Sequence, residues 1–424
     1  MDGFFKALRR AGVVLAVYAV FFLARAFVLE WRAVRLDTVK PVYLHYEFIE
    51  LRLRTRDLGL RAKWSSSPPS ARVTRGGALV PGIAGISEVP LRWDGSKQAW
   101  LGRWPCPWNA ADGPYAIELL GSPEEGHRLR SRPFRIARRV AKVLPPRFAV
   151  LTWESVRPLA SLTVQSPDGT LKDWRGLLDW VEYAGADAFW MLAGQTPGLL
   201  KGETWVGHNL ALIPEVAKEC RRRGLKFGVW AMGTLTMSEE DRVPGYRYAL
   251  DVDEAGRPKA TRALSLADPR RPADVAALLG RYKDLPGVDY LGLDYIRNAL
   301  GGYELVDEFL RDMPGVPFPA QWTALSAQER MAAFARKKVA RKDARFIDAW
   351  QWWRAHKTSL IIRSIKDALG DEKALWAFTL TWEKGWHHGQ DPVMFSDAGV
   401  DANALMLYEA DSAQFEQMLR DYAT

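Results

Sequence analysis

Four carboxylate side chains stand at or just beyond the ends of predicted strands, where α/β enzymes place their chemistry. They are Glu154, Asp294, Glu383 and Glu409. The carboxyl ends of parallel strands meet at one edge of a sheet or barrel, so such side chains can share a site. Glycoside cleavage needs two carboxyl groups facing one bond, one a proton donor and the other a nucleophile or base. The pattern therefore indicates glycan chemistry.

Asp294 is the principal candidate because it follows a short apolar strand, residues 290–293, that is bounded by a Pro286-Gly287 turn. Arg297 lies three residues further on and could hold this carboxylate ionised. We therefore expect Asp294 to stabilise or attack the developing oxocarbenium carbon. The alternatives are that Asp294 caps the following segment or that Arg297 forms an ordinary loop salt bridge.

The predicted partner of Asp294 is Glu383, which follows the next strand and could be desolvated by Trp382. Glu409 is the second choice for the acid. A separation of about 5–5.5 Å would indicate retention, and about 6.5–9.5 Å would indicate inversion. Glu383 could instead be a solvated loop residue that pairs with Lys384.

Aromatic and polar side chains at other strand ends and in adjoining loops are candidates for sugar binding. They are Trp153, Glu154, Trp190, His208, Trp230, Tyr295, Arg297, Trp382, Trp386, His387 and Tyr408. Core filling explains many such tryptophans equally well. The adjacent His387 and His388 have no third ligand at a suitable spacing, so we predict no metal and no cofactor.

Residues 145–424 alternate predicted strands and helices, which favours a parallel sheet with right-handed crossovers. Strands are predicted at residues 148–153, 187–192, 226–232, 290–293, 374–380 and 402–407, and helices at 171–184, 210–223, 274–282, 345–369 and 413–422. Residues 248–268 are expected to be irregular. A (β/α) barrel is the predicted fold, and an incomplete or truncated barrel is the alternative, because six strands can be counted where a closed barrel has eight.

Residues 37–144 are expected to form an immunoglobulin-like β-sandwich, a small all-β domain. Short segments with apolar and polar alternation are separated by Pro, Gly and Ser, as in a sandwich. These segments are residues 50–56, 60–64, 71–74, 89–93, 115–120 and 134–136. Cys106 and Cys220 are the two cysteines and lie in different predicted domains, so no disulfide framework is expected.

Residues 1–36 combine a basic start with an apolar run over residues 11–24, as in a signal peptide or an uncleaved membrane anchor. Either interpretation places the rest in the cell envelope: anchored to the inner membrane facing the periplasm, or secreted. Residues 1–145 hold 24 Lys+Arg and 12 Asp+Glu, a charge of +12, and the remainder holds 35 and 38, a charge of −3. The basic β-domain suits anionic surfaces or envelope protein partners, and no nucleic-acid motif is present.

The stretch Val288-Asp-Tyr-Leu-Gly-Leu-Asp-Tyr-Ile-Arg297 resembles a strand of the bacterial family 10-like putative glycosyl hydrolases. The resemblance spans about residues 146–424 and includes the helix with Trp353-Arg354. It implies a TIM barrel, a carbohydrate ligand and an acidic catalytic or stabilising role for Asp294. Leu293 and Glu409 depart from the family pattern.

Two functions from different classes follow from these observations. The first is an extracytoplasmic glycoside hydrolase that acts on an envelope or extracellular polysaccharide. The second is a catalytically inactive barrel that binds carbohydrate or serves as a scaffold in an envelope assembly.

Overall fold

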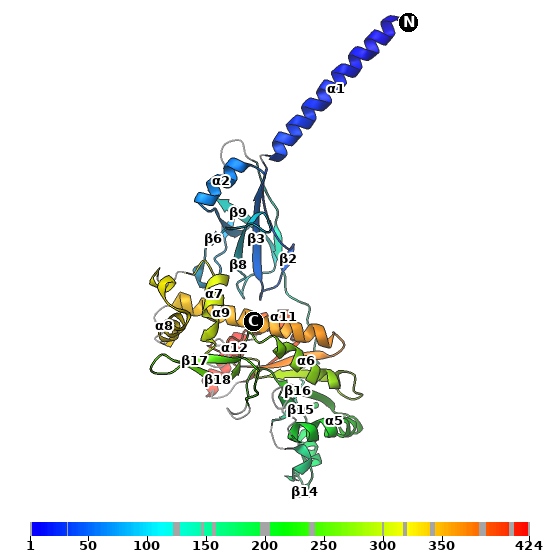
Figure 1. The fold of residues 1–424 in the computed structure, drawn as a ribbon. Helices are drawn as coiled ribbons and strands as arrows, with labels where there is room; N and C mark the ends of the chain where they lie inside the picture. Colours follow the sequence, from blue (N-terminus) through cyan, green and yellow to red (C-terminus); the bar gives the residue numbers. More distant parts are fainter. Residues whose placement is uncertain are drawn as a thin grey trace. The chain divides into compact units, whose positions relative to one another are not determined.

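The structure is a computed structural model that describes residues 2–31, 33–121, 128–145, 148–154, 158–195, 204–236, 242–298, 301–316, 320–339, 344–380, 387–406 and 411–422. The chain is a mixed α/β protein and divides into two compact units (Figure 1). The first unit comprises Met1–Tyr43, Glu47–Ala137 and Met313–Gly315. The second comprises Leu44–Tyr46, Arg138–Asp312 and Val316–Thr424.

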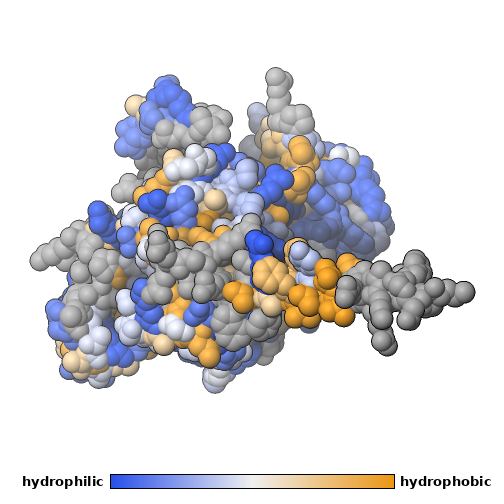
Figure 2. Space-filling view, turned by 90° about the horizontal axis from the view of Figure 1, so that it is seen from above, coloured by the Kyte–Doolittle hydropathy of each residue, from blue (hydrophilic) through white to orange (hydrophobic). Residues whose placement is uncertain are grey.

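The first unit begins with the helix α1 (Asp2–Trp31), whose described apolar side chains, among them Leu15, Phe22 and Leu23, are exposed. This part of α1 appears in orange at the right of Figure 2. Among the described residues, none of the helices combines the length and apolar character that a membrane crossing requires. The membrane anchor or signal peptide stays a prediction.

Two sheets of mainly antiparallel strands form the rest of the first unit. One has the order β10 (Arg128–Ser131), β1 (Ala33–Thr38), β3 (Phe48–Thr55), β8 (Ala99–Pro105), β7 (Arg92–Asp94). The other has the order β2 (Val42–Tyr43), β11 (Phe134–Ile136), β9 (Gly113–Leu120), β4 (Ser70–Arg75), β5 (Ala78–Leu79), with β6 (Val89–Pro90) also paired to β4.

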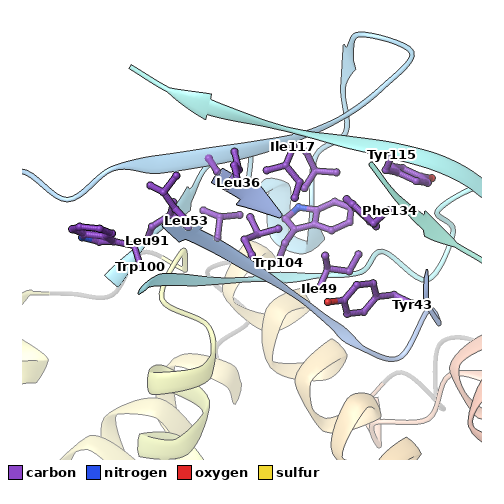
Figure 3. Close-up of a cluster of buried hydrophobic side chains, with 14 of the residues drawn as sticks. Leu36, Tyr43, Ile49, Leu53, Leu91, Trp100, Trp104, Tyr115, Ile117 and Phe134 are labelled. Carbon is purple, nitrogen blue, oxygen red and sulfur yellow. The ribbon is translucent and has the colours of Figure 1, made fainter. Parts of the chain in front are cut away.

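Side chains from both sheets meet in one buried cluster (Figure 3). Leu36 and Trp104 come from the first sheet, and Ile117 and Phe134 come from the second. Alternate residues of each strand point inward, which is the arrangement that the sequence pattern predicts for a two-sheet domain. A relationship to immunoglobulin domains remains a prediction.

Residues 60–64, predicted as a strand, instead lie in the helix α2 (Leu58–Ser66). Asp57 caps this helix by accepting a hydrogen bond from the Leu60 N–H at 2.9 Å. Leu60 and Trp64 are both buried and lie four residues apart, so they share one helical face. The N-cap and this spacing together favour a helix, and they override the short run of alternation.

The second unit is built on a parallel sheet. Its order is β12 (Val150–Trp153), β15 (Ala188–Gln195), β16 (Lys226–Met232), β19 (Tyr290–Asp294), β20 (Ala374–Leu380), β21 (Ala402–Met406). Each neighbouring pair is parallel, which confirms the predicted strand order. A full barrel is not shown, because the described sheet has six strands and no pairing between β12 and β21.

The helices of the second unit are α3 (Arg175–Tyr183), α5 (Thr204–Arg222), α6 (Arg270–Lys283), α7 (Val306–Asp312), α8 (Ala327–Val339), α9 (Ala344–Leu369), α11 (Pro392–Ala398) and α12 (Ser412–Tyr422). Helices α3 and α5 contact β15, and α6 contacts β16 and α9. Strands so covered are apolar on both faces, as the uninterrupted burial of β16 beyond Lys226 illustrates.

Two predictions about connecting segments were wrong. Residues 171–172 belong to a short hairpin, β13 (Val164–Gln165) with β14 (Leu171–Lys172), so α3 starts later than expected. Residues 248–268 contain a second hairpin, β17 (Tyr248–Val252) with β18 (Pro258–Leu264). The turn between β17 and β18 is stabilised by Arg257, whose backbone N–H donates to Asp253 Oδ1.

The opposite face of the sheet from these covering helices carries a cluster that we call the tryptophan face: Trp190, Trp230, Tyr290 and Trp376. Trp190 and Trp376 stack with ring centroids 3.8 Å apart. Their rings lie over Gly228 and Gly292, where an added Cβ would overlap them. Glycine on the two central strands thus makes room for aromatic rings from the strands on either side.

Candidate functional site

Asp294 is the last residue of β19, on the tryptophan face. Side chains alternate along a strand, so Asp294 points to the same face as Tyr290 and Gly292. Its backbone pairs with Met232 of β16, and its carbonyl accepts a hydrogen bond from the Gly233 N–H at 2.7 Å. The strand end is therefore held against β16 and the residue that follows it.

Tyr295 has a φ of +48°, an uncommon conformation for a residue with a side chain. Its carbonyl accepts from the Thr234 N–H at 3.0 Å and from the Thr234 hydroxyl. The same hydroxyl oxygen accepts from the Arg297 N–H at 2.8 Å. An uncommon backbone conformation persists where the surrounding contacts hold it in place. Residues in such conformations cluster at ligand-binding and catalytic sites.

Asp294 is 4% exposed, and its carboxyl group accepts a hydrogen bond from the Tyr295 N–H at 2.5 Å. Burial raises the pKa of Asp294 to about 7. The N–H of Tyr295 opposes this rise, the charge of Glu154 adds to it, and Arg297 is the weakest influence. The expectation that Arg297 holds Asp294 ionised was therefore wrong, because desolvation of the charged form outweighs one cation.

Arg297 instead lies over the Tyr295 ring, with its guanidinium carbon 5.0 Å from the ring centroid. This cation–π contact helps to orient the tyrosine.

Glu154 lies just beyond β12 and is joined to the end of β19 through Tyr295. The Tyr295 hydroxyl donates to Glu154 Oε1 at 2.9 Å. Burial raises the pKa of Tyr295, as do this hydrogen bond and the charge of Glu154, so the hydroxyl keeps its proton. One residue thus contacts two carboxyl groups, Asp294 through its backbone N–H and Glu154 through its side chain.

Trp190 and Trp230 were predicted to bind sugar, and this was wrong. Their exposed fractions are 5% and 0%, so both rings fill the core. A large aromatic ring suits a buried strand position as well as a sugar-binding site. The sequence alone does not distinguish the two environments. Trp153 ends β12 and is half-buried, and its indole N–H has no hydrogen-bond partner among the described residues.

His387 and His388 are placed beside the segment that follows β19. The His387 carbonyl accepts from the buried Arg354 at 3.0 Å, and the His388 carbonyl accepts from the Asn298 N–H at 3.2 Å. His388 Nδ1 lies 2.8 Å from the Asn298 carbonyl oxygen. Within the ranges that the structure describes, no three His, Cys, Asp or Glu side chains gather as a metal site.

Several predicted residues lie outside the described ranges, and nothing tests their roles. They are Trp382, Glu383, Trp386, Tyr408 and Glu409, together with the side chain of His208. The predicted pairing of Asp294 with Glu383 or Glu409 therefore stays a prediction.

Sequence reasoning missed two residues that support the site, Thr234 and Arg271. Thr234 lies two residues beyond β16, and that position after a strand was the signal that could have identified it. Arg271 is fully buried in α6 and donates to the Gly233 carbonyl at 2.6 Å. Burial lowers the pKa of Arg271 to about 9. No local pattern distinguishes it from the exposed arginines of the same helix.

No family model and no curated protein matches this chain. The pullulanase of Paenibacillus barengoltzii in complex with maltohexaose and α-cyclodextrin is 12% identical, with a TM-score of 0.23, covering 61% of this chain and 48% of that one. Pullulanase type I from Bacillus subtilis str. 168, complexed with maltose, is 10% identical with a TM-score of 0.21, covering 68% and 48%.

The chain thus spans about half the length of these glycoside hydrolases. Their low TM-scores carry no argument about the activity of this chain. The resemblance to family 10-like glycosyl hydrolases stays a prediction.

Proposed function

We propose that the second unit is a glycan-directed, glycoside-hydrolase-like domain whose described carboxyl pair is Asp294 and Glu154. The observation that carries this proposal is the double role of Tyr295. Its backbone N–H bonds Asp294 and its hydroxyl bonds Glu154. Carboxyl groups from two different strand ends are thereby linked through one residue at an edge of a parallel sheet, where α/β proteins bind ligands.

The two carboxyl groups have different surroundings, which supports different roles. With a pKa of about 7, Asp294 carries a proton in a large fraction of molecules near neutral pH and acts as the general acid. It transfers that proton to the glycosidic oxygen as the bond from this oxygen to the anomeric carbon breaks. Glu154 is exposed and supplies the carboxylate that attacks the anomeric carbon or activates water. Glu383 and Glu409 remain candidates for that second role.

The test uses the full chain with soluble α-glucans, β-glucans, uronate-containing polysaccharides and aryl glycosides as substrates. Asp294→Asn and Glu154→Gln should each lower kcat/KM by about 100-fold or more, because each removes a group that transfers a proton or electron pair. Asp294→Asn should lose least on aryl glycosides, whose good leaving groups need little protonation.

The matched control is Asp289→Asn, which changes an aspartate just before the opposite end of β19. Asp289 accepts from the Phe227 N–H at 3.0 Å, so it supports the sheet and not the carboxyl pair. Activity equal to wild type in Asp294→Asn would overturn the assignment of the acid. Turnover retained in Glu154→Gln but lost in Glu383→Gln would transfer the second role to Glu383.

A non-catalytic carbohydrate-binding or scaffold role is the second candidate. The 4% exposure of Asp294 favours it, because a buried carboxyl group has little room to approach a glycosidic oxygen. This alternative predicts no turnover by the wild-type chain on any of these substrates, and glycan binding in pull-down assays that survives Asp294→Asn.

We also propose that the chain acts outside the cytoplasm, in the cell envelope or after secretion, on an envelope or extracellular polysaccharide. The basic start and apolar run of residues 1–36 support export. A reporter fused after Val140 that is active in the cytoplasm alone would contradict this location.

A further inference from the structure

The side chain of Thr234, which lies two residues beyond β16, is buried against the segment 295–297. Its hydroxyl oxygen accepts a hydrogen bond from the Arg297 N–H at 2.8 Å. The hydroxyl group also lies within hydrogen-bond distance of the Tyr295 and Arg297 carbonyl oxygens, so its single hydrogen serves two acceptors. One side chain thus binds both ends of this short segment.

The backbone around Thr234 connects the same segment to a neighbouring hairpin. The Thr234 N–H donates to the Tyr295 carbonyl at 3.0 Å, and the Thr234 carbonyl accepts at 2.9 Å from the N–H of Leu264, the last residue of β18. Gly233 approaches the end of β19 so closely that an added Cβ would lie 3.3 Å from the Asp294 carbonyl oxygen. Thr234 is therefore packed between β18 and the end of β19.

The contacts of Thr234 hold Tyr295 in an uncommon backbone conformation, with a φ of +48°. A residue with a side chain rarely adopts a positive φ, and the conformation persists where surrounding contacts determine it. In this conformation the Tyr295 N–H bonds Asp294, and the Tyr295 hydroxyl bonds Glu154. The link between the two carboxyl groups therefore depends on how the Tyr295 peptide is held.

We propose that Thr234 is a positioning residue for the carboxyl pair: its hydroxyl group holds the Tyr295 peptide so that one residue links Asp294 to Glu154. This inference rests on the catalytic function proposed above for the pair, but the positioning itself can be tested without turnover. Valine has nearly the shape of threonine and lacks the hydroxyl group. Thr234→Val therefore removes the side-chain hydrogen bonds and little of the packing, and Thr234→Ser keeps the hydroxyl group.

The first measurement compares kcat and KM of these two variants of the full chain with those of the wild type, on the polysaccharides and aryl glycosides named above. Thr234→Val should lower kcat by about 10-fold or more at an unchanged KM, because a small displacement of catalytic groups affects the transition state more than substrate binding. Thr234→Ser should retain most of the wild-type kcat.

The second measurement follows the titration of Asp294 and needs no turnover. Burial raises the pKa of Asp294 to about 7, the Tyr295 N–H opposes this rise, the charge of Glu154 adds to it, and Arg297 is the weakest influence. Displacement of the Tyr295 N–H in Thr234→Val should therefore raise the pKa of Asp294 further. Stability is lost as pH rises through the folded pKa, so this loss should extend to higher pH in Thr234→Val.

Urea unfolding between pH 4 and pH 9 measures this shift. The wild type is compared with Asp294→Asn, and Thr234→Val is compared with the double variant that also carries Asp294→Asn. The difference within each pair isolates the titration of Asp294 from the other titrations of the chain.

Thr236→Val is the matched control. Thr236 is buried in the same connecting segment, and its hydroxyl group donates to the Arg262 carbonyl of β18 at 2.9 Å. The substitution removes a comparable buried hydrogen bond, so it should lower the free energy of unfolding. It should leave kcat and the titration of Asp294 unchanged, because this bond holds β18 and not the Tyr295 peptide.

The outcomes separate the positioning role from the catalytic proposal. A shifted Asp294 titration in Thr234→Val, in a chain that has no turnover, would support the positioning role and contradict the catalytic function. An unchanged titration together with a wild-type kcat would overturn the positioning role and leave the catalytic function intact. An equal shift in Thr236→Val would also overturn it.

Thr234→Ala provides a second variant without the hydroxyl group. It should shift the titration of Asp294 in the same direction as Thr234→Val, and Thr234→Ser should not shift it. Failure of both Thr234→Val and Thr234→Ala to fold would make Thr234 a purely structural residue and would overturn the positioning role.

Discussion

Asp294 is buried at the end of β19, and its carboxyl group accepts a hydrogen bond from the Tyr295 backbone N–H. Arg297 is close in sequence, but its guanidinium lies over the Tyr295 ring. Removing a carboxylate from water costs more than a partly solvated cation returns. Asp294 consequently has a pKa near neutrality, which suits a proton donor better than a permanently ionised nucleophile.

At the residue scale, Asp294→Asn should flatten the pH dependence of stability. The ordinary pKa of an aspartate is about 4, and that of folded Asp294 is about 7. The folded state binds more protons between these values, so the free energy of unfolding falls as pH rises from about 4 to about 7. The contribution present below this window and lost above it is at most about 4 kcal/mol. Asparagine cannot titrate and should lack this slope.

Urea unfolding followed by tryptophan fluorescence between pH 4 and pH 8 measures this effect. Burial also raises the pKa of Asp391, to about 6, so the wild-type curve contains more than one titration. The difference between wild type and Asp294→Asn isolates Asp294. Parallel curves for the two proteins across the window would show that Asp294 has an ordinary pKa.

The parallel sheet positions the site through its central strands. Gly228 and Gly292 leave space for the stacked Trp190 and Trp376, and this layer lies one step below Asp294 on the same face. The stacked rings pack against β16 and β19 and thereby help to fix the position of the strand end that carries the carboxyl group. Dense packing of this kind transmits a change at one strand to its neighbours.

At the element scale, Gly292→Ala should destabilise the second unit by about 1–3 kcal/mol, the usual cost of overpacking a core. The new Cβ would overlap the Trp376 ring and displace it from Trp190. Thermal unfolding and the near-ultraviolet circular dichroism of the tryptophans should both change.

The comparison variant for this prediction is Gly280→Ala, in α6, where an added Cβ meets no atom within 4 Å. Alanine in a helix interior is favoured over glycine by roughly 0.5–1 kcal/mol. This variant should therefore be neutral or slightly stabilised. Equal destabilisation of the two variants would contradict the packing explanation.

Across the whole molecule, segments far apart in sequence converge on buried carboxylates of the second unit. Asp397 Oδ2 lies 2.7 Å from His45 Nδ1, and Asp397 Oδ1 accepts from the Arg139 N–H at 2.9 Å. Asp401 Oδ1 accepts from both terminal nitrogens of Arg139 at 3.0 Å, and Asp401 Oδ2 accepts from the Leu375 N–H at 2.9 Å. These bonds join residues 44–46 to α11, and residues 138–142 to α11 and to the segment just before β21.

At this scale, Asp401→Asn should lower the stability of the second unit by about 1.5–3 kcal/mol, the range for hydrogen bonds to charged groups. Burial acts against ionisation of Asp401, but its hydrogen bonds and the charges of Lys366 and Arg139 outweigh burial and lower its pKa. Its stabilisation is therefore present above the ordinary aspartate pKa and lost as pH falls through the folded value.

Asp371→Asn is the control for Asp401→Asn, since Asp371 also pairs with Lys366, at 3.1 Å, but its side chain is 87% exposed. An exposed pair contributes at most about 1 kcal/mol. Chemical denaturation at pH 7 and pH 3.5 measures both variants. The prediction fails if the two variants lose the same stability at pH 7.

The amino-acid sequence by itself determined the order of elements. Uninterrupted apolar runs such as residues 226–232 and 374–380 are local signals, and they predicted the parallel strands and their neighbours correctly. The sequence also identified Asp294 and Glu154 as carboxylates beside strand ends. These inferences depend on hydrophobic period and on short-range turn chemistry, both of which are contained within a few consecutive residues.

Tertiary structure alone decided how those residues act. The bond between Tyr295 and Glu154 joins positions 141 residues apart, and the pKa of Asp294 depends on its burial and on the charge of Glu154. The burial of Trp190 was likewise set by tertiary packing, over Gly228 on the neighbouring strand. Burial and long-range pairing are properties of the assembled sheet, so no local pattern in the chain encodes them.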